Sequence, residues 1–183
     1  MVEFKFSLIP QGMGLFGEAL MYSGHFYFLN DQYFIDFPDP FLMQNKEQVN
    51  GQLHERPCFY AFEDSSYEGL FWLIPFSSQT NKYQLIYDKK IQRYSRCDTI
   101  VFGEVLGKYK AFLIQNMCPA TSKYIHNEYF DSTSNIPVRV NGTLEKEIIA
   151  KAKKVLALQR QGKKLIFPDI QKIEKELIKT LPS

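Results

Sequence analysis

Two short segments of the sequence carry residue types that suit phosphodiester chemistry. His54-Glu55-Arg56-Pro57 stands directly before an aromatic run, and Ser77-Ser78-Gln79 stands directly after an apolar one. If these runs are strands, a guanidinium and two hydroxyls lie at strand ends, where both groups can donate to the oxygens of one phosphate. The histidine two residues before the arginine can take up a proton near neutral pH. The candidate catalytic residues are therefore Arg56, Ser77, Ser78 and His54.

Each of these residues also has a structural interpretation, which the sequence leaves open. An arginine beside a proline can be an ordinary surface residue, and serines after a strand commonly form a turn through their hydroxyls. A single histidine in a loop is often structural or merely exposed.

The segment after the serines, residues 81–96, has five cations and one acidic residue, with tyrosines between them. Cations neutralise phosphates, and aromatic rings can stack on unpaired bases, which is how single-stranded RNA is commonly held. The alternative is a solvated helix face with its tyrosines in the core. The candidate RNA-binding residues are Lys82, Tyr83, Lys89, Lys90, Arg93 and Arg96, with Lys146, Lys153 and Lys154 on a later helix.

Several classes of site are not supported by the sequence. It has no dinucleotide-binding glycine motif, Walker A loop, Gly-x-Ser-x-Gly elbow or His-Glu-x-x-His motif. The three histidines are far apart, and the three cysteines include no Cys-x-x-Cys pair. We therefore expect no metal, no cofactor and no disulfide framework.

The composition predicts a protein of the cytoplasm. The longest apolar run, residues 70–76, is much shorter than the roughly 20 residues of a membrane span. The N-terminus has an acidic residue, Glu3, and no cationic segment of the kind that opens a signal peptide. We expect a reducing compartment and no membrane association. The net charge of +2 is in itself a weak argument for a polyanionic partner.

Periodicity predicts one domain over residues 21–183, with strands before residue 130 and helices after residue 140. The aromatic content, 15%, is typical of a compact sheet or barrel. Residues 1–20 are either an N-terminal extension or include an extra strand over residues 2–9. The expected strands are residues 25–29, 33–37, 57–62, 70–76, 99–106 and 111–117, with a loop at 39–51.

Three helices are predicted. Apolar residues recur at helical spacing over residues 81–94. A second helix should begin after Thr143 as its N-cap and run to Gln161, and a third should begin at Pro168.

The order of these segments resembles that of the ToxN/AbiQ toxins. The resemblance is carried by His25-Phe26-Tyr27-Phe28, by Arg56-Pro57-Cys58-Phe59-Tyr60-Ala61 and by Ile74-Pro75-Phe76-Ser77-Ser78. The run from Lys110 to Pro119, and the lysine-rich helix followed by Phe167-Pro168-Asp169-Ile170, are most similar to the CptN/TenpN branch. The resemblance extends from Met21 to the end of the sequence.

The resemblance implies an α+β fold, with a strongly twisted antiparallel sheet or small barrel flanked by helices and a helical C-terminus. It implies a metal-independent, sequence-selective endoribonuclease, in which a ribose 2'-hydroxyl attacks the adjacent phosphate to leave a 2',3'-cyclic phosphate and a 5'-hydroxyl. The implied partners are target mRNA and a pseudoknotted repeat RNA. Members of the family cut this antitoxin RNA from a precursor and are inhibited by it in a closed toxin–RNA assembly, as type III toxin–antitoxin pairs.

One residue departs from the family pattern. By position, Arg56 stands where ToxN-like members have a catalytic lysine, and Ser77 with Ser78 stands where they have Thr-Ser or Ser-Ser. Arginine keeps its proton near neutrality, so Arg56 would stabilise charge on the phosphorane and leave proton transfer to another group. Tyr124 and Tyr129 are candidates for a tyrosine that the family places on a later helix, and neither is assigned.

Two other classes of function compete with this one. A noncatalytic RNA-binding module would need the basic helix but not the arginine and serines at strand ends. A protein-interaction barrel is disfavoured by the cations on two helical faces. A tandem array of short RNA repeats upstream of the gene would favour the toxin.

Overall fold

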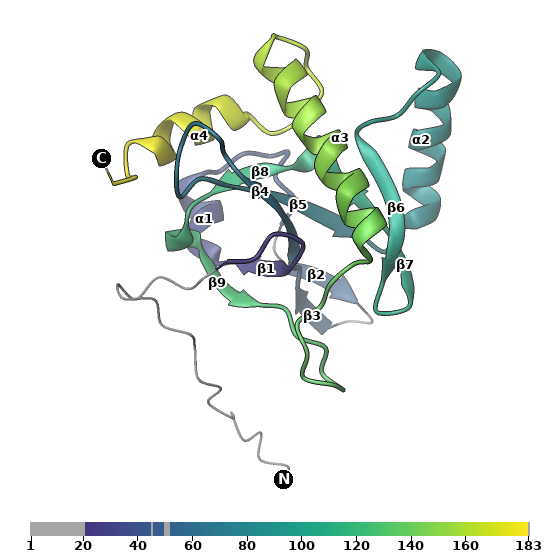
Figure 1. Cartoon of the computed structure of the whole chain (residues 1–183), viewed down its shortest axis with the longest axis horizontal. Helices are drawn as coiled ribbons and strands as arrows, with labels where there is room; N and C mark the ends of the chain where they lie inside the picture. The colour runs from purple at the N-terminus through teal and green to yellow at the C-terminus, as the bar shows by residue number, and fades with distance from the viewer. Residues whose placement is uncertain (1–20, 45, 50–51, 183) are drawn as a thin grey trace.

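A computed structural model of the chain describes residues 21–44, 46–49 and 52–182 (Figure 1). The two alternatives for residues 1–20 lie outside the described residues. The first described strand is β1 (Phe26–Leu29), within the run expected from the sequence.

The strands form a seven-stranded antiparallel sheet in the order β6-β7-β5-β4-β1-β9, with β8 paired to β5. Strand β5 is central, because β4 pairs along one edge of it while β8 and β7 share the other edge. The described strands do not close into a barrel, so the predicted α+β fold is confirmed in its open-sheet form. Beyond β1, the strands are β4 (Cys58–Glu63), β5 (Phe71–Ser77), β6 (Ile100–Val105), β7 (Lys108–Leu113), β8 (Cys118–Ala120) and β9 (Ile125–Glu128).

Helices cover both faces of the sheet. On one face, α3 (Gly142–Arg160) packs its apolar stripe against aromatic residues of the central strands. Helix α3 lies close to β6 at Gly103. A Cβ atom added to this glycine would lie 2.1 Å from the side chain of Leu144. On the other face, α2 (Thr80–Tyr94) covers β6 and β7, so that α3 and α2 flank β6 (Figure 1).

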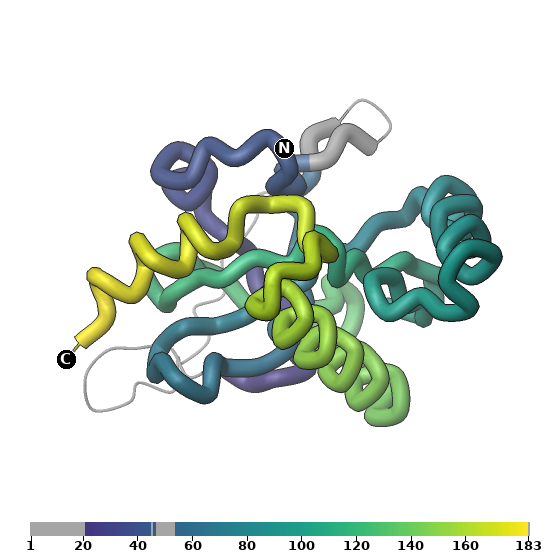
Figure 2. The backbone as a smooth tube through the Cα atoms, turned by 90° about the horizontal axis from the view of Figure 1, so that it is seen from above, coloured from purple at the N-terminus to yellow at the C-terminus, as the bar shows by residue number. Residues whose placement is uncertain are grey.

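The rest of that second face is covered by two shorter helices. α1 (Asp31–Asp36) and α4 (Ile170–Ile178) bury Tyr33 and Leu177 against β1, β4, β5 and β8. Figure 2 shows α2 and α4 at opposite ends of the molecule.

Some local predictions were wrong. The strand expected over residues 33–37 is absent there, because residues 33–36 belong to α1 and Phe37 is its C-cap; Asn30 caps the start of α1 by accepting a hydrogen bond from the main chain of Tyr33 at 3.1 Å. The strand expected over residues 111–117 ends earlier, and the chain continues in a 3₁₀ turn, η1 (Ile114–Asn116). The predicted loop over residues 39–51 contains β2 (Lys46–Val49), which pairs with β3 (Gln52–Glu55) in a separate two-stranded sheet.

The predicted helix over residues 81–94 is confirmed as α2, whereas the starts of the two later helices shift. The N-cap of α3 is Asn141 and not Thr143, since the Asn141 side chain accepts from the main chain of Leu144 at 2.8 Å. The N-cap of α4 is Asp169, directly after the predicted start at Pro168. A short η2 turn (Ser122–Tyr124) precedes β9.

Candidate active site

The first serine after the apolar run closes the end of β5. Ser77 is only 3% exposed, and its hydroxyl accepts a hydrogen bond from the main-chain N–H of Gln79 at 3.1 Å. The next main-chain bond, from Thr80 to the carbonyl of Ser78 at 2.9 Å, leads the chain into α2. Ser77 therefore forms the hydroxyl-bonded turn that the sequence left open as its structural interpretation.

The second serine faces solvent beside a cation. Lys110 of β7 donates from Nζ to the Ser78 hydroxyl at 2.5 Å. The strand register explains the contact, because Ser77 pairs with Ala111, which brings the next residue of β5 opposite Lys110. Ser78 is exposed and Lys110 is half-buried, so a hydroxyl and an ammonium are presented together at this end of the sheet.

Lys110 was not among the candidate residues of the sequence analysis. It stands 32 residues after Ser78, in a run noted only for its family resemblance. The antiparallel pairing of β5 with β7 joins the two, and no local pattern around either residue predicts that register.

Arg56 lies between β3 and β4, two residues before the strand that pairs along the other side of β5. Continuing the pairing of Cys58 with Pro75 by two residues puts Arg56 opposite Ser77. Strand alternation then places Arg56 on the face of Cys58, and places Ser78 and Lys110 on the opposite face. Burial raises the pKa of the Cys58 thiol, and the positive charge of Arg56 acts against that rise.

His54 lies on the separate β2–β3 hairpin. It is exposed, and its main chain pairs with that of Glu47. The next residue, Glu55, approaches His126 at 3.9 Å, which joins this hairpin to β9. The structure thus brings Ser78 together with Lys110, and places Arg56 and His54 on neighbouring elements.

The basic face of α2 begins directly after this site. Lys82, Lys89 and Arg93 are exposed, and the Lys82 ammonium lies 5.5 Å from the centre of the Tyr83 ring. Tyr83 itself is half-buried against the core of β6 and β7. The exposed cations extend the positive surface away from Ser78 along the helix.

Lys90 is different from its neighbours on α2. Its ammonium points inward and donates to Thr99 Oγ1 at 2.6 Å and to Gln115 Oε1 at 2.8 Å. Burial lowers the pKa of Lys90. Lys90 therefore ties α2 to the sheet.

An aspartate joins the basic residues of α2 and α3. Asp98 accepts from Lys154 at 2.7 Å and lies 3.9 Å from the guanidinium of Arg96. Lys146 and Lys153 are exposed along the same helix, with the Lys153 ammonium 5.3 Å from the centre of the Phe62 ring. The two predicted basic surfaces thus meet at Asp98.

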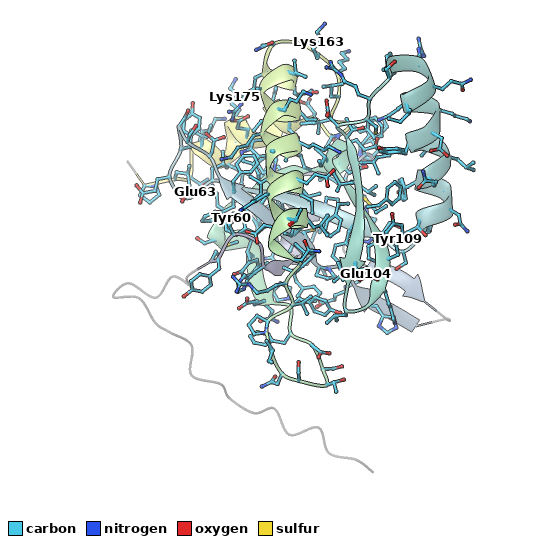
Figure 3. All side chains as sticks on the ribbon, turned by 45° about the vertical axis from the view of Figure 1, so that its right-hand side comes forward. Tyr60, Glu63, Glu104, Tyr109, Lys163 and Lys175 are labelled. Carbon is cyan, nitrogen blue, oxygen red and sulfur yellow. The ribbon has the colours of Figure 1, made fainter. Side chains whose placement is uncertain are left out.

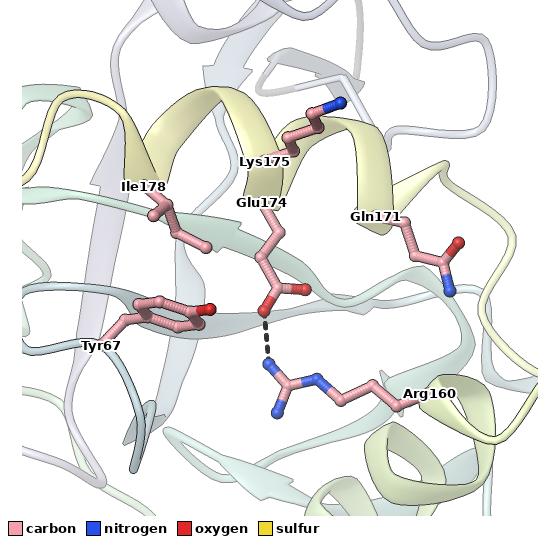
Figure 4. A pocket seen from close by; sticks show the side chains of 6 residues that line it. All are labelled: Tyr67, Arg160, Gln171, Glu174, Lys175 and Ile178. Atoms are coloured by element: carbon pink, nitrogen blue, oxygen red, sulfur yellow. Dashed lines mark hydrogen bonds and ion pairs between the residues drawn. The ribbon is translucent and has the colours of Figure 1, made fainter.

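A surface pocket lies at the other end of β5. It has a volume of about 420 Å³, and Arg160 and Glu174 meet in it at 2.5 Å (Figure 4). The same guanidinium binds Asp64 at 2.7 Å. Seven residues of β5 separate this end from Ser78, which is a distance of roughly 20 Å.

The described residues form neither a metal-binding cluster nor a membrane-spanning helix. Within residues 21–44, 46–49 and 52–182 there is no cluster of three or more His, Cys, Asp or Glu that could hold a metal ion. In the same part of the chain, no helix is long and apolar enough to cross a membrane.

No protein-family model matches the sequence, and no curated protein shows significant similarity to it.

Proposed function

We propose that the chain is an endoribonuclease whose reaction centre is the pair Ser78 and Lys110. The observation that carries the proposal is the 2.5 Å contact between the Lys110 ammonium and the exposed Ser78 hydroxyl, at the start of a basic helix. A hydroxyl and an ammonium at one point can both donate to the same phosphate. The cations of α2 and α3 provide the surface that a polyanion needs.

In the proposed reaction a ribose 2'-hydroxyl attacks the adjacent phosphorus. The bond from O2' to phosphorus forms as the bond to O5' breaks; the 2'-oxygen loses its proton to water, and the 5'-oxygen gains one. Ser78 and Lys110 donate to the nonbridging oxygens, where negative charge develops. Lysine can also release its proton, unlike arginine, so Lys110 can protonate the departing 5'-oxygen. Arg56 lies on the opposite face of the sheet, so its charge can contribute to RNA binding without direct contact with the reacting phosphate.

The resemblance to the ToxN/AbiQ toxins supports the same activity. We propose that the protein acts in the cytoplasm as the toxin of a type III toxin–antitoxin pair. A repeat RNA would bind the basic residues of α2 and α3 as the antitoxin, and the toxin would cut that RNA from its precursor and cleave mRNA when released. A role in phage defence would follow from such release.

The direct test is incubation of purified protein with RNA in EDTA. Every group in the proposed centre is a side chain, so we expect cleavage without a divalent ion, with products that end in a 2',3'-cyclic phosphate and a 5'-hydroxyl. Mass spectrometry of the fragments identifies the chemical groups at both ends of the cleaved RNA. A strict requirement for a divalent ion, or 3'-hydroxyl products, would refute this centre; binding with no cleavage would favour the noncatalytic RNA-binding module.

A further inference from the structure

The tip of the β6–β7 hairpin presents an exposed aromatic ring next to the proposed reaction centre in sequence, on the opposite face of the same strand. Tyr109 directly precedes Lys110, and 56% of its surface is exposed. Its ring is stacked on that of Phe102, with centroids 5.7 Å apart and an angle of 10° between the planes. Phe102 in turn packs on Tyr87 of α2, so the inner face of Tyr109 is supported from below.

A carboxylate lies next to this ring. Glu104 pairs directly with Tyr109 across the hairpin, so both side chains are on one face of the sheet, as Figure 3 shows. The two-residue turn at Leu106-Gly107 makes Val105 and Lys108 the hydrogen-bonded closing pair, and the next pair is then the closer, non-hydrogen-bonded kind. Glu104 is exposed and makes no salt bridge or side-chain hydrogen bond within the described part of the chain.

The strand edge beside Tyr109 is open because β5 has already ended. If β5 continued in register, Gln79 would pair with Tyr109. The N–H of Gln79 is instead donated to Ser77 Oγ at 3.1 Å, and its carbonyl accepts from Tyr83 at 3.2 Å. A bound strand can therefore cross this edge from the Ser78 side to the Tyr109 side.

The turn itself is strained and apolar. Leu106 has a φ of 50° and Gly107 a φ of 68°, a combination that normally selects Asn-Gly. Leu106 is also 46% exposed. Residues with such strained backbone angles are concentrated at active sites and ligand-binding loops.

We propose that Tyr109 and Glu104 form a subsite for one unpaired nucleobase that carries an exocyclic amino group, next to the phosphate held by Ser78 and Lys110. The base stacks on the outer face of Tyr109, and its amino group donates to Glu104. The carboxylate repels phosphate from this face, and uracil, which has no exocyclic amino group, can offer it only the ring N3–H. This subsite rests on the proposed RNA substrate.

The test uses Ser78→Ala protein and short single-stranded oligouridines, so that no cleavage disturbs the binding. One oligouridine carries a single adenosine, a second carries purine riboside at that position, and a third has uridine throughout. Stacking and the amino contact together should make the adenosine RNA bind about ten- to a hundredfold tighter than the all-uridine RNA. Purine riboside, which stacks but has no amino group, should bind with intermediate affinity.

Each side chain of the subsite has its own variant in this background. Tyr109→Leu keeps the apolar contact with Phe102 but has no flat ring, so it should lose the preference for adenosine and for purine riboside over uridine. Glu104→Met should remove only the difference between adenosine and purine riboside. Tyr109→Phe should bind like the parent, and so should Tyr67→Ala, which removes another exposed tyrosine at the pocket of Figure 4.

The outcomes separate this subsite from the proposed activity. Unchanged base preference in folded Tyr109→Leu overturns the subsite, even if the parent protein cleaves RNA. A Tyr109-dependent preference for adenosine supports the subsite, even if the parent protein fails to cleave, in which case only the proposed activity is lost. Equal binding of all three RNAs to the Ser78→Ala protein overturns the subsite directly.

Discussion

The two ends of β5 carry polar groups of opposite character. Near its start, the Trp72 indole donates to Asp64 at 2.9 Å, and Arg160 donates to the same carboxylate at 2.7 Å. The Asp64 side chain is 1% exposed, so its charge is held by fixed donors. Just past the other end, Ser78 is exposed and Lys110 points at its hydroxyl.

The Asp64 end is therefore a structural network, whereas the Ser78 end is a site that can accept a substrate. At the Asp64 end, burial would raise the pKa of the carboxyl, but hydrogen bonds from Trp72, Ser66 and Arg160 hold that pKa below its usual value. Those donors are already used within the protein. At the Ser78 end, the hydroxyl is exposed in contact with the Lys110 ammonium, where a ligand can approach it. The pocket lined by Arg160 and Glu174 thus belongs to the structural end, and the chemistry is expected at the other.

The largest expected effect is on cleavage at the Ser78 end. Ser78→Ala or Lys110→Ala should each lower the cleavage rate by about a hundred- to a thousandfold, which is typical for removal of one donor to a developing anion. The free energy of unfolding should change by no more than about 0.5 kcal/mol, because both changes lie at the surface. Single-turnover cleavage and urea unfolding measure the two quantities.

Arg56 supplies the control for this prediction. Arg56 lies on the opposite face of the sheet, so Arg56→Ala should cost some RNA affinity and slow cleavage less than either change at the centre, whereas Arg56→Lys should keep the charge and most of both properties. If folded Ser78→Ala and Lys110→Ala both cleave at the parental rate, the proposed centre is wrong.

The second expected effect is on stability at the Asp64 end. Asp64→Ala leaves the buried indole N–H without its acceptor and Arg160 without one of its two carboxylates. We expect a loss of about 2 to 3 kcal/mol in the free energy of unfolding, less than for a fully buried ion pair because Arg160 is 38% exposed. Cleavage per folded molecule should be unchanged. If Asp64→Ala lost most of its activity at normal stability, the Asp64 end would be the functional one and the assignment of the two ends would be wrong.

The pH dependence of this stability follows from the lowered pKa of Asp64. Its carboxylate is stabilised in the folded protein, so the contribution is complete above the unfolded pKa of about 3.9 and is lost as pH falls through the lower folded value. The difference in unfolding free energy between the parent and Asp64→Asn should therefore be constant near neutral pH and decrease only below about pH 4. Denaturant unfolding at pH 7 and pH 3 tests this.

The sequence predicted the strands and helices well where periodicity was long. The apolar run that became β5 and the amphipathic segments that became α2 and α3 were found from spacing alone. Helix α1 was missed because the capping residue Asn30 followed by Asp31 is also a typical turn sequence. For the candidate site, the sequence located Ser78 at its strand end, but the partner Lys110 depends on long-range register, which residue spacing does not encode.

The smallest expected effect compares two adjacent lysines on the helix that begins after Ser78. Lys89 is exposed, whereas the ammonium of Lys90 is bound to Thr99 and Gln115. If the exposed face of α2 contacts phosphates, Lys89→Ala should reduce the slope of log affinity against log salt by about 0.7 to 0.9 for the lost contact. Lys90→Ala should leave the slope unchanged and lower the stability of the protein, because it removes a tie between α2 and the sheet. Fluorescence anisotropy of a labelled RNA over a salt series measures the slope, and Leu85→Ala on the same helix, an exposed uncharged position, serves as the matched control. A reduced slope for Lys90→Ala with no change for Lys89→Ala would mean that the inward ammonium turns out to reach the RNA, and would place the phosphate path nearer the sheet than the exposed face of α2.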